Sequence, residues 1–405
     1  MRDIIRTLLL YATGAPRWER VVVDSLVSSF GLTTALQRIA ASVPEYWFQN
    51  PYVRSLLSDG YCNLSYVHDW QQAFCQEPLL ECTTCNLNNF FEFRKCLQRI
   101  RDYDLIVILH SAAGDNMKFL RTATTALQSR RGKLLVFFGN EYNLMLEKIG
   151  FAKEVGAEFI ASQLPLVAAE WLYADCDASH VLLAPPALNP ELYRSNSRPR
   201  PIDIGFRGDA YRFTLGDVER SNLINFFRKY SEQWGLFADI KFVRYHRTQW
   251  VTFLNQCKGI IGAESGTYYL EKDDRTQLAV EQYVQQNPNA GFEDIYTRFF
   301  KGYPNPVSGK AISSRHFEPI GTNTCQILLE GSYNGILRAD EHYISIKKDF
   351  SNLDDVLMRF MDPGYRDRMV RQTYEYVLNQ HTYKHRVGSL LEAMYLKQVS
   401  PAAIG

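Results

Sequence analysis

Short continuous apolar runs alternate with stretches of helical periodicity along the first half of the chain. Two helical patterns lie between the runs, one from Pro16 to Phe30 and one from about Pro165 to Ala174. The apolar runs are Thr7–Ala12, Asp104–Leu109, Lys133–Phe138, Glu158–Ser162 and His180–Ala184. Strands that are apolar on both faces are typical of a parallel sheet covered by helices. The first half is therefore predicted to be a doubly wound α/β domain.

The alternation restarts after a polar, proline-rich break at 195–201, which is the best domain boundary in the chain. A helical pattern runs from Val218 to Tyr230, and another from Tyr365 to Leu396 is interrupted near His381. The strands expected here are Ile202–Phe206, Ile240–Val243, Gly259–Gly262, Cys325–Leu329 and Tyr343–Ile346. We therefore expect two doubly wound domains, 1–194 and 202–375, followed by a helical segment at 376–405.

Residues 265–312 do not follow this alternation. The stretch holds a polar helical pattern from Asp274 to Gln286 and then aromatic and proline-rich segments. It is interpreted as an insertion in the second domain, either a lid over its face or a solvated surface excursion.

Composition and charge exclude several classes of protein. Of the 405 residues 46% are hydrophobic, and 45 Lys and Arg against 44 Asp and Glu leave a formal net charge of +1. A global field that would attract nucleic acid or anionic lipid is therefore not expected. No apolar run reaches the roughly 18 residues that cross a bilayer, and no secretory signal opens the chain, so a cytoplasmic protein is predicted.

Five of the eight cysteines fall close together in the first domain. Cys82 and Cys85 have the two-residue gap with which two thiolates can bind one zinc ion. No second pair at standard spacing accompanies them, so reduced, partly buried thiols are favoured over a structural zinc site. The five are Cys62, Cys75, Cys82, Cys85 and Cys96.

Two facing doubly wound domains would bring the carboxyl ends of their strands together across a cleft, where such sheets bind ligands. The segment Ser313–Gly321 is the most informative of those that lie at this edge. It places Arg315, His316 and Glu318 in a loop that enters a helix, and a helix start beside cations suits a diphosphate. A carboxylate at Glu318 can accept both hydroxyls of a ribose. The alternative is a surface ion pair and a helix cap.

Other strand ends add candidates on both domains. Arg207, together with Arg212, could complete a phosphate clamp, and Glu264 could contact a ligand or simply turn the chain. Glu141 and His110, which follow strands of the first domain, are candidate general bases. Otherwise Glu141 would cap the next helix, and His110 would hydrogen-bond to backbone.

Three motifs in the same order resemble the CgeB-like glycosyltransferases. They are Ser314–Glu318 with Gly321, the run Cys325–Leu329 followed by Asp354–Leu357, and the closing His381–Arg386. The break near Pro186–Tyr193 also looks like the interdomain linker of that family, and the resemblance covers about 130–395 without 265–312.

The resemblance implies a GT-B fold: two Rossmann-like domains, with a nucleotide-sugar donor in the second and an acceptor in the first. Glu318 would then hold the donor ribose, Arg315 would lie near the phosphates, and Gly321 would let the backbone approach the donor. The last helix would cross back to the first domain. Lys310 stands where many retaining relatives have a second Glu, so it could contact the diphosphate, and retention of configuration is not implied. His316 falls within the same donor motif, and no catalytic metal is expected.

These expectations combine into one functional hypothesis. The chain is predicted to be a cytoplasmic glycosyltransferase that moves a sugar from a nucleotide-sugar to a glycan or lipid-linked glycan in surface polysaccharide synthesis. Peripheral association with membrane-bound glycan machinery fits this role, and nucleic acid is not expected as a partner. The alternatives are a nucleotide-sugar 2-epimerase of the same architecture and a non-catalytic glycan-binding relative.

Overall fold

A computed structural model describes most of the chain and divides it into two units. The described residues are 4–12, 22, 25, 65–114, 116–177, 179–196, 198–209, 213–245, 247–304 and 307–395. The amino-terminal unit comprises Met1–Ser162, Tyr173–Ala184 and Lys384–Gly405, and the carboxyl-terminal unit comprises Gln163–Leu172 and Pro185–Tyr383. The helix predicted from Pro16 to Phe30, apart from Val22 and Ser25, lies outside the described residues, as do Cys62 and Arg212.

The amino-terminal unit is built on a parallel sheet with the strand order β2-β1-β3-β4-β5-β6. All five apolar runs of the first half form strands, as predicted. The sixth strand, β2, was not predicted, because its sequence alternates polar and apolar residues. This strand lies at the edge of the sheet and pairs with a neighbour on one side only. An edge strand is partly exposed to solvent, so its sequence does not need to be apolar throughout. The strands are β1 (Ile5–Tyr11), β2 (Leu80–Asn86), β3 (Leu105–Ile108), β4 (Lys133–Phe137), β5 (Phe159–Ser162) and β6 (His180–Leu183).

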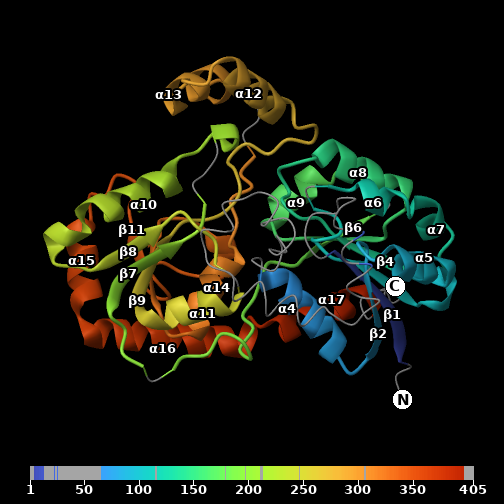
Figure 1. Cartoon of the computed structure of the whole chain (residues 1–405), viewed down its shortest axis with the longest axis horizontal. Helices are drawn as coiled ribbons and strands as arrows, with labels where there is room; N and C mark the ends of the chain where they lie inside the picture. The colour runs from blue at the N-terminus through green and yellow to red at the C-terminus, as the bar shows by residue number, and fades with distance from the viewer. Residues whose placement is uncertain are drawn as a thin grey trace, which may run out of the picture. The chain divides into compact units, whose positions relative to one another are not determined.

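Helices follow the strands of this unit in the order expected of a doubly wound fold (Figure 1). The last of them, α17, is held to β4 by Lys133, whose Nζ donates to the carbonyl of Met394 and lies 4.3 Å from the ring centroid of Tyr395. The helices are α4 (Ser65–Gln76), α5 (Phe90–Gln98), α6 (Lys118–Arg121), α7 (Thr124–Gln128), α8 (Met145–Glu154) and α17 (Tyr383–Tyr395), with the 3-10 turn η2 (Ile100–Asp102).

The carboxyl-terminal unit is built on a second parallel sheet, with the strand order β11-β10-β9-β7-β8. The five strands predicted for the second half all form. Two strands begin two residues earlier than predicted: β8 starts at Ala238 and β9 starts at Cys257. The half-buried edge strand β8 starts with Ala238 and Asp239 rather than with its apolar centre. The strands are β7 (Ile202–Arg207), β8 (Ala238–Lys241), β9 (Cys257–Gly262), β10 (Cys325–Leu329) and β11 (Ile344–Ile346). The chain thus has two Rossmann-like α/β units, which confirms the predicted fold class.

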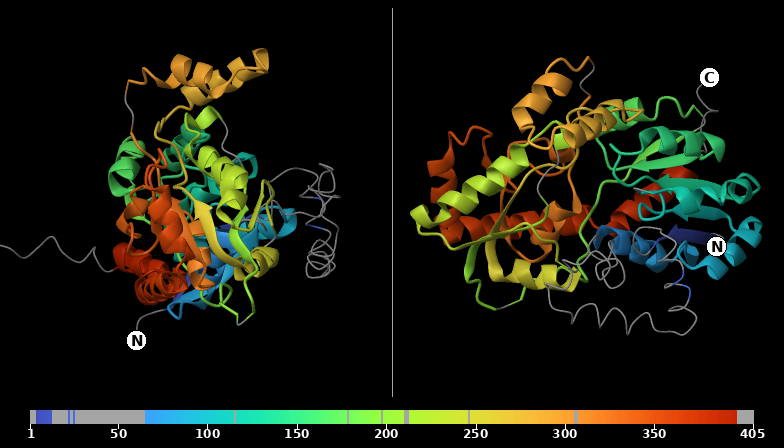
Figure 2. Two further views of the ribbon diagram at one scale, coloured as in Figure 1. Left: turned by 90° about the vertical axis from the view of Figure 1, so that its left-hand side faces the viewer. Right: turned by 45° about the horizontal axis from the view of Figure 1, so that its top comes forward.

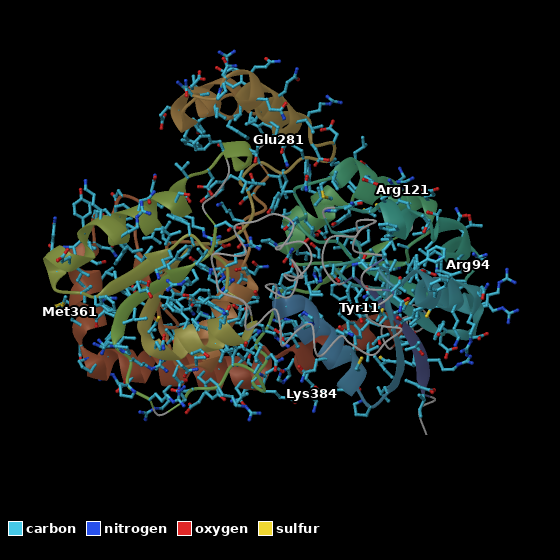
Figure 3. All side chains as sticks on the ribbon, in the orientation of Figure 1. Tyr11, Arg94, Arg121, Glu281, Met361 and Lys384 are labelled. Carbon is cyan, nitrogen blue, oxygen red and sulfur yellow. The ribbon has the colours of Figure 1, made fainter. Side chains whose placement is uncertain are left out.

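Helices cover both faces of this second sheet (Figure 1). The predicted interruption near His381 separates α16 from α17, and Figure 3 marks Met361 at the end of α15 and Lys384 at the start of α17. The helices on this sheet are α10 (Glu219–Tyr230), α11 (Arg247–Gln256), α14 (Ser314–Gly321), α15 (Leu353–Met361) and α16 (Pro363–Gln380), with the turns η3 (Phe213–Leu215), η4 (Ser231–Trp234) and η6 (Tyr333–Gly335). Helix α9 (Leu166–Leu172), which follows β5 in sequence, is grouped with the same unit.

The segment predicted as an insertion carries α12 (Arg275–Gln286), α13 (Phe292–Ile295) and the π-helical turn η5 (Tyr296–Phe300). These elements pack around a small apolar cluster of Val280, Ile295 and Phe300 and stand away from the five-stranded sheet (Figure 2). The polar helix predicted at Asp274–Gln286 is confirmed, and a lid function stays a prediction.

None of the helices in the described part of the chain is both long enough and apolar enough to cross a membrane.

Candidate functional site

A pocket opens in the carboxyl-terminal unit where β7 and β9 end and α14 begins. It encloses about 450 Å³ of space that is open in part to solvent. Three strands reach this edge of the sheet, so the pocket has the position at which doubly wound sheets bind ligands. Its polar and aromatic lining includes Arg207, Arg220, Trp250, Ser313, Arg315 and His316.

His316 fixes the start of α14 at this edge. The Ser313 backbone N–H donates to Nδ1 of His316 at 2.9 Å, and Nε2 of the same ring donates to the carbonyl of Ala263, just after β9, at 3.1 Å. Burial lowers the pKa of His316 to about 4, so the ring is neutral near pH 7. The predicted donor-site histidine therefore ties the amino end of α14 to the end of β9.

Arg315, Trp250 and Glu318 form one cluster against the pocket, in which Trp250 and Glu318 are buried and Arg315 is half-buried. The Trp250 indole donates to Oε2 of Glu318 at 2.7 Å, and Nε of Arg315 lies 3.8 Å from the same oxygen. The guanidinium carbon of Arg315 is 4.2 Å from the Trp250 ring centroid. Glu318 is only 3% exposed, so its pairing with Arg315 is not a surface ion pair.

One atom of this cluster is left without a partner. Nη1 of Arg315 is buried and has no hydrogen-bond partner among the residues that the structure describes. Burial also lowers the pKa of Arg315. A buried cationic donor with an unused N–H is costly, and a charged acceptor is what best satisfies it. The pocket is therefore equipped for an anion at Arg315.

Arg207 lines the same pocket but is already heavily engaged. Its Nη2 pairs with Asp239 at 2.6 Å, and its guanidinium carbon lies 4.0 Å from the Phe253 ring centroid. Arg220 is the third arginine of the lining, and its charge adds to the effect of burial in lowering the pKa of both Arg315 and His316. Sequence reasoning missed Arg220 and Trp250 because both lie inside helices rather than directly after strands.

Lys310 and Glu264 lie near this region but outside the described lining of the pocket. Lys310 is buried, pairs with Asp217 and has its Nζ 4.6 Å from the ring centroid of Tyr268. Oε1 of Glu264 accepts from the backbone N–H of Tyr333 at 2.7 Å, which holds the turn after β10. Their predicted contacts with a donor stay predictions.

The backbone at Gly321 packs closely against another part of the same chain, at Tyr193. A Cβ at this position would lie 2.6 Å from both Cβ and the carbonyl oxygen of Tyr193. We expect Gly321→Ala to lower the free energy of unfolding by about 1–3 kcal/mol, because it overpacks a fixed backbone contact. Gly388→Ala is the matched control, since a Cβ there meets nothing within 4 Å. Urea denaturation measures both, and an unchanged G321A midpoint would contradict the expectation.

The amino-terminal unit places Glu141 and His110 just after β4 and β3. Oε1 of Glu141 accepts from the Ser162 hydroxyl at 2.7 Å and from the Tyr173 hydroxyl at 2.8 Å. Glu141 does not cap the following helix, whose N-cap is Leu144. Among the described residues of either unit, no three His, Cys, Asp or Glu side chains are grouped to hold a metal ion.

His110 is enclosed by aromatic rings. The centroid of its own ring lies 4.9 Å from that of Phe137 and 5.2 Å from that of Tyr66. Burial, together with the charge of Lys148, lowers the pKa of His110 to about 3. Nδ1 is buried and has no hydrogen-bond partner within the described ranges.

Two of the buried histidines, His110 and His316, make stability depend on pH, and burial lowers the pKa of a third, His342, in the same direction. The pKa values of about 3 for His110 and about 4 for His316 both lie below the unfolded value of about 6.5. Between the folded and the unfolded pKa values, the unfolded chain therefore binds more protons than the folded chain. The free energy of unfolding should be at its full value above pH ~6.5 and should fall as the pH drops toward 4. Each histidine contributes a slope of up to about 1.4 kcal/mol per pH unit.

Urea denaturation at pH 7, 6 and 5 checks this expectation. His316→Asn should flatten the slope, whereas the exposed His180→Asn should leave it unchanged. An equal slope in H316N and the parent chain would show that His316 does not contribute.

Comparison with known proteins adds a family resemblance for part of the chain. Residues 268–392 match a family model described as "Glycosyl transferase-like". The matched segment contains α14 with Arg315 and Glu318, and it begins inside the stretch that was set aside as an insertion. No curated protein matches the chain in sequence. Most of the matched segment lies in the carboxyl-terminal unit, and its last residues, 384–392, lie in the amino-terminal unit.

Solved structures share only a distant likeness with the chain. Anabaena Alr3699/HepE, solved in complex with UDP and glucose, is 11% identical, and the match covers 96% of this chain and 100% of that one with a TM-score of 0.43. An alpha,alpha-trehalose-phosphate synthase (UDP-forming) from Burkholderia vietnamiensis is 9% identical, with 99% and 100% covered and a TM-score of 0.42. Likeness at this level assigns no function.

Proposed function

We propose that the chain is a glycosyltransferase of the GT-B type that uses a nucleotide-sugar donor. The donor nucleotide would bind in the pocket at the start of α14. The unpartnered, buried Nη1 of Arg315 is the observation that carries this proposal. The glycosyl transferase-like match over 268–392 supports the same class of reaction.

The pocket offers the groups that a nucleoside diphosphate needs. Arg315 and Arg220 would bind the phosphates, and Arg315 is preorganised for this by stacking on Trp250. Glu318 lies behind Arg315 and is not in the lining of the pocket, so its contact with the ribose hydroxyls is a part of the proposal that the pocket itself does not support. Stabilising the charge of the leaving diphosphate is the main catalytic need of glycosyl transfer, so these cations would act on the leaving group without a metal ion.

The acceptor would bind to the amino-terminal unit. Glu141 is the better candidate for a base there, because His110, with a pKa of about 3, is a poor proton acceptor near neutral pH. The acceptor that we propose is a glycan or lipid-linked glycan, processed in the cytoplasm during surface polysaccharide synthesis. Peripheral association with membrane-bound glycan machinery belongs to the same proposal.

Thermal denaturation with nucleoside diphosphates tests the donor site. A diphosphate at 100 times its Kd should add about 2.7 kcal/mol to the free energy of unfolding and raise Tm. We expect UDP, GDP, ADP and CDP to differ, because only one base should fit. No shift with any of them would overturn the donor-site proposal and would leave a glycan-binding protein as the alternative.

Product analysis then separates the possible reactions. With the nucleotide-sugar that corresponds to the selected base, a glycosyltransferase needs an acceptor to form a new glycoside. A nucleotide-sugar 2-epimerase would change the sugar without any acceptor, and that result would overturn the transferase proposal.

A further inference from the structure

Two arginines of the pocket lie on neighbouring aromatic rings of α11. The guanidinium carbon of Arg315 is 4.2 Å from the ring centroid of Trp250. That of Arg207 is 4.0 Å from the ring centroid of Phe253. The two rings are stacked on each other, with centroids 5.7 Å apart and an interplanar angle of 25°. Helix α11 therefore supports each of these arginines with one aromatic ring.

Each of the two arginines also lies beside a carboxylate, and the two pairs differ in their distances. Nη2 of Arg207 donates to Oδ2 of Asp239 at 2.6 Å, so this ion pair is closed. Nε of Arg315 is 3.8 Å from Oε2 of Glu318, about 1 Å farther than a charge-assisted hydrogen bond of about 2.8 Å. Arg315 and Glu318 are three residues apart on α14, a spacing that favours an ion pair. Their separation therefore has a cause other than their spacing.

The indole of Trp250 makes the hydrogen bond that Arg315 does not make. Nε1 of Trp250 donates at 2.7 Å to Oε2 of Glu318, the same oxygen that lies nearest to Arg315. Phe253 has no N–H group, and the arginine on its ring is paired with a carboxylate. The arginine on the Trp250 ring keeps Nη1 without a hydrogen-bond partner among the described residues. The indole N–H thus satisfies a buried carboxylate that would otherwise attract the guanidinium group.

We propose that Trp250 is a positioning residue that keeps Arg315 free to bind an anion. The N–H of Trp250 occupies Glu318, and its ring holds the planar guanidinium group, so that Nη1 is left for an oxygen of a diphosphate. This inference rests on the proposed function, because the diphosphate is that of the nucleotide-sugar donor. Without the indole N–H, Glu318 would be a buried carboxylate that lacks this donor, and the guanidinium group of Arg315 would close onto it.

Titration calorimetry of the whole protein with inorganic pyrophosphate tests this role, because pyrophosphate has no ribose that Glu318 could contact. Trp250→Phe keeps an aromatic ring but removes the N–H. We expect this variant to weaken pyrophosphate binding by about 10- to 100-fold, the loss of one charge-assisted hydrogen bond. Trp234→Phe is the matched control and should bind as the parent chain does, since Trp234 packs against the core of the same unit and does not line the pocket.

An isosteric replacement separates the lost hydrogen bond from lost packing. The amino acid 3-benzothienylalanine fills the volume of tryptophan but has a sulfur atom where indole has its N–H. We expect 3-benzothienylalanine in place of Trp250 to weaken pyrophosphate binding as much as Trp250→Phe does, and this measurement decides the matter if W250F folds poorly. Full affinity in the isosteric variant would overturn the proposal.

The charge of Glu318 provides a second readout, which a purely structural role of Trp250 would not change. Glu318→Gln removes the carboxylate that would hold Arg315, so it should raise pyrophosphate affinity at least about threefold more in W250F than in the parent chain. An equal effect of E318Q in both backgrounds would overturn the proposal. No pyrophosphate binding by the parent chain would overturn the donor site as well, whereas full binding by W250F would overturn the role of Trp250 alone.

Discussion

Replacing Arg315 by alanine is expected to weaken nucleoside diphosphate binding by about 10- to 100-fold. The loss reflects one charge-assisted hydrogen bond, worth about 1.5–3 kcal/mol. The free energy of unfolding should fall as well, because the substitution leaves the buried carboxylate of Glu318 without the cation that lies 3.8 Å from it. The loss of affinity is therefore measured on the folded protein, without urea and at a temperature well below Tm.

Two further variants distinguish the contribution of the positive charge of Arg315 from that of its planar guanidinium group. Arg315→Lys keeps the positive charge but loses the planar group that stacks on Trp250, so binding should be intermediate. Arg338→Ala is the control, since Arg338 is exposed and pairs with Glu341 at the surface. Titration calorimetry gives the affinities, and urea denaturation gives the stabilities. If R315A were clearly destabilised while its affinity was unchanged, Arg315 would be a structural residue.

The fold was predictable because the buried strands have continuous apolar sequences. Lys133–Phe137 and Leu105–Ile108 are buried in the middle of the first sheet, and a strand with two covered faces must be apolar throughout. The edge strand β2 was not predictable in this way. Its residues meet solvent as well as core, so Cys82 and Cys85 were read as a spacing motif and not as strand positions.

Only some residues of the candidate site could be predicted from the sequence. Arg315 and Glu318 could be found because they lie close together in a loop that enters a helix ahead of the apolar strand Cys325–Leu329. Trp250, which binds both, lies 68 residues from Glu318 in sequence, and only the folded chain brings them together. The pairing of Arg207 with Asp239 likewise depends on the register between β7 and β8, which the sequence does not reveal.

Replacing Lys148 by methionine is expected to lower the free energy of unfolding of the amino-terminal unit by about 1–3 kcal/mol, the usual cost of leaving buried hydrogen-bonding groups without a partner. Lys148 is fully buried, and its Nζ donates to the carbonyls of Gly139, Asn140 and Asn143. Methionine fills the same volume but leaves these acceptors without their donor. The loop also contains left-handed backbone at Asn140, with φ of 47°, so it depends on this anchor.

Urea denaturation followed by hydrogen exchange at residues 139–144 measures the effect of K148M. Lys153→Met on the same helix is the matched control, because Lys153 is exposed and should change stability by less than about 0.5 kcal/mol. The charge of Lys148 also helps to lower the pKa of His110, so the pKa of His110 should rise in K148M, which NMR can follow. Equal stability of the two variants would mean that water replaces the ammonium group at the three carbonyls. Glu141, which lies in this loop, would then be held by Ser162 and Tyr173 without help from Lys148.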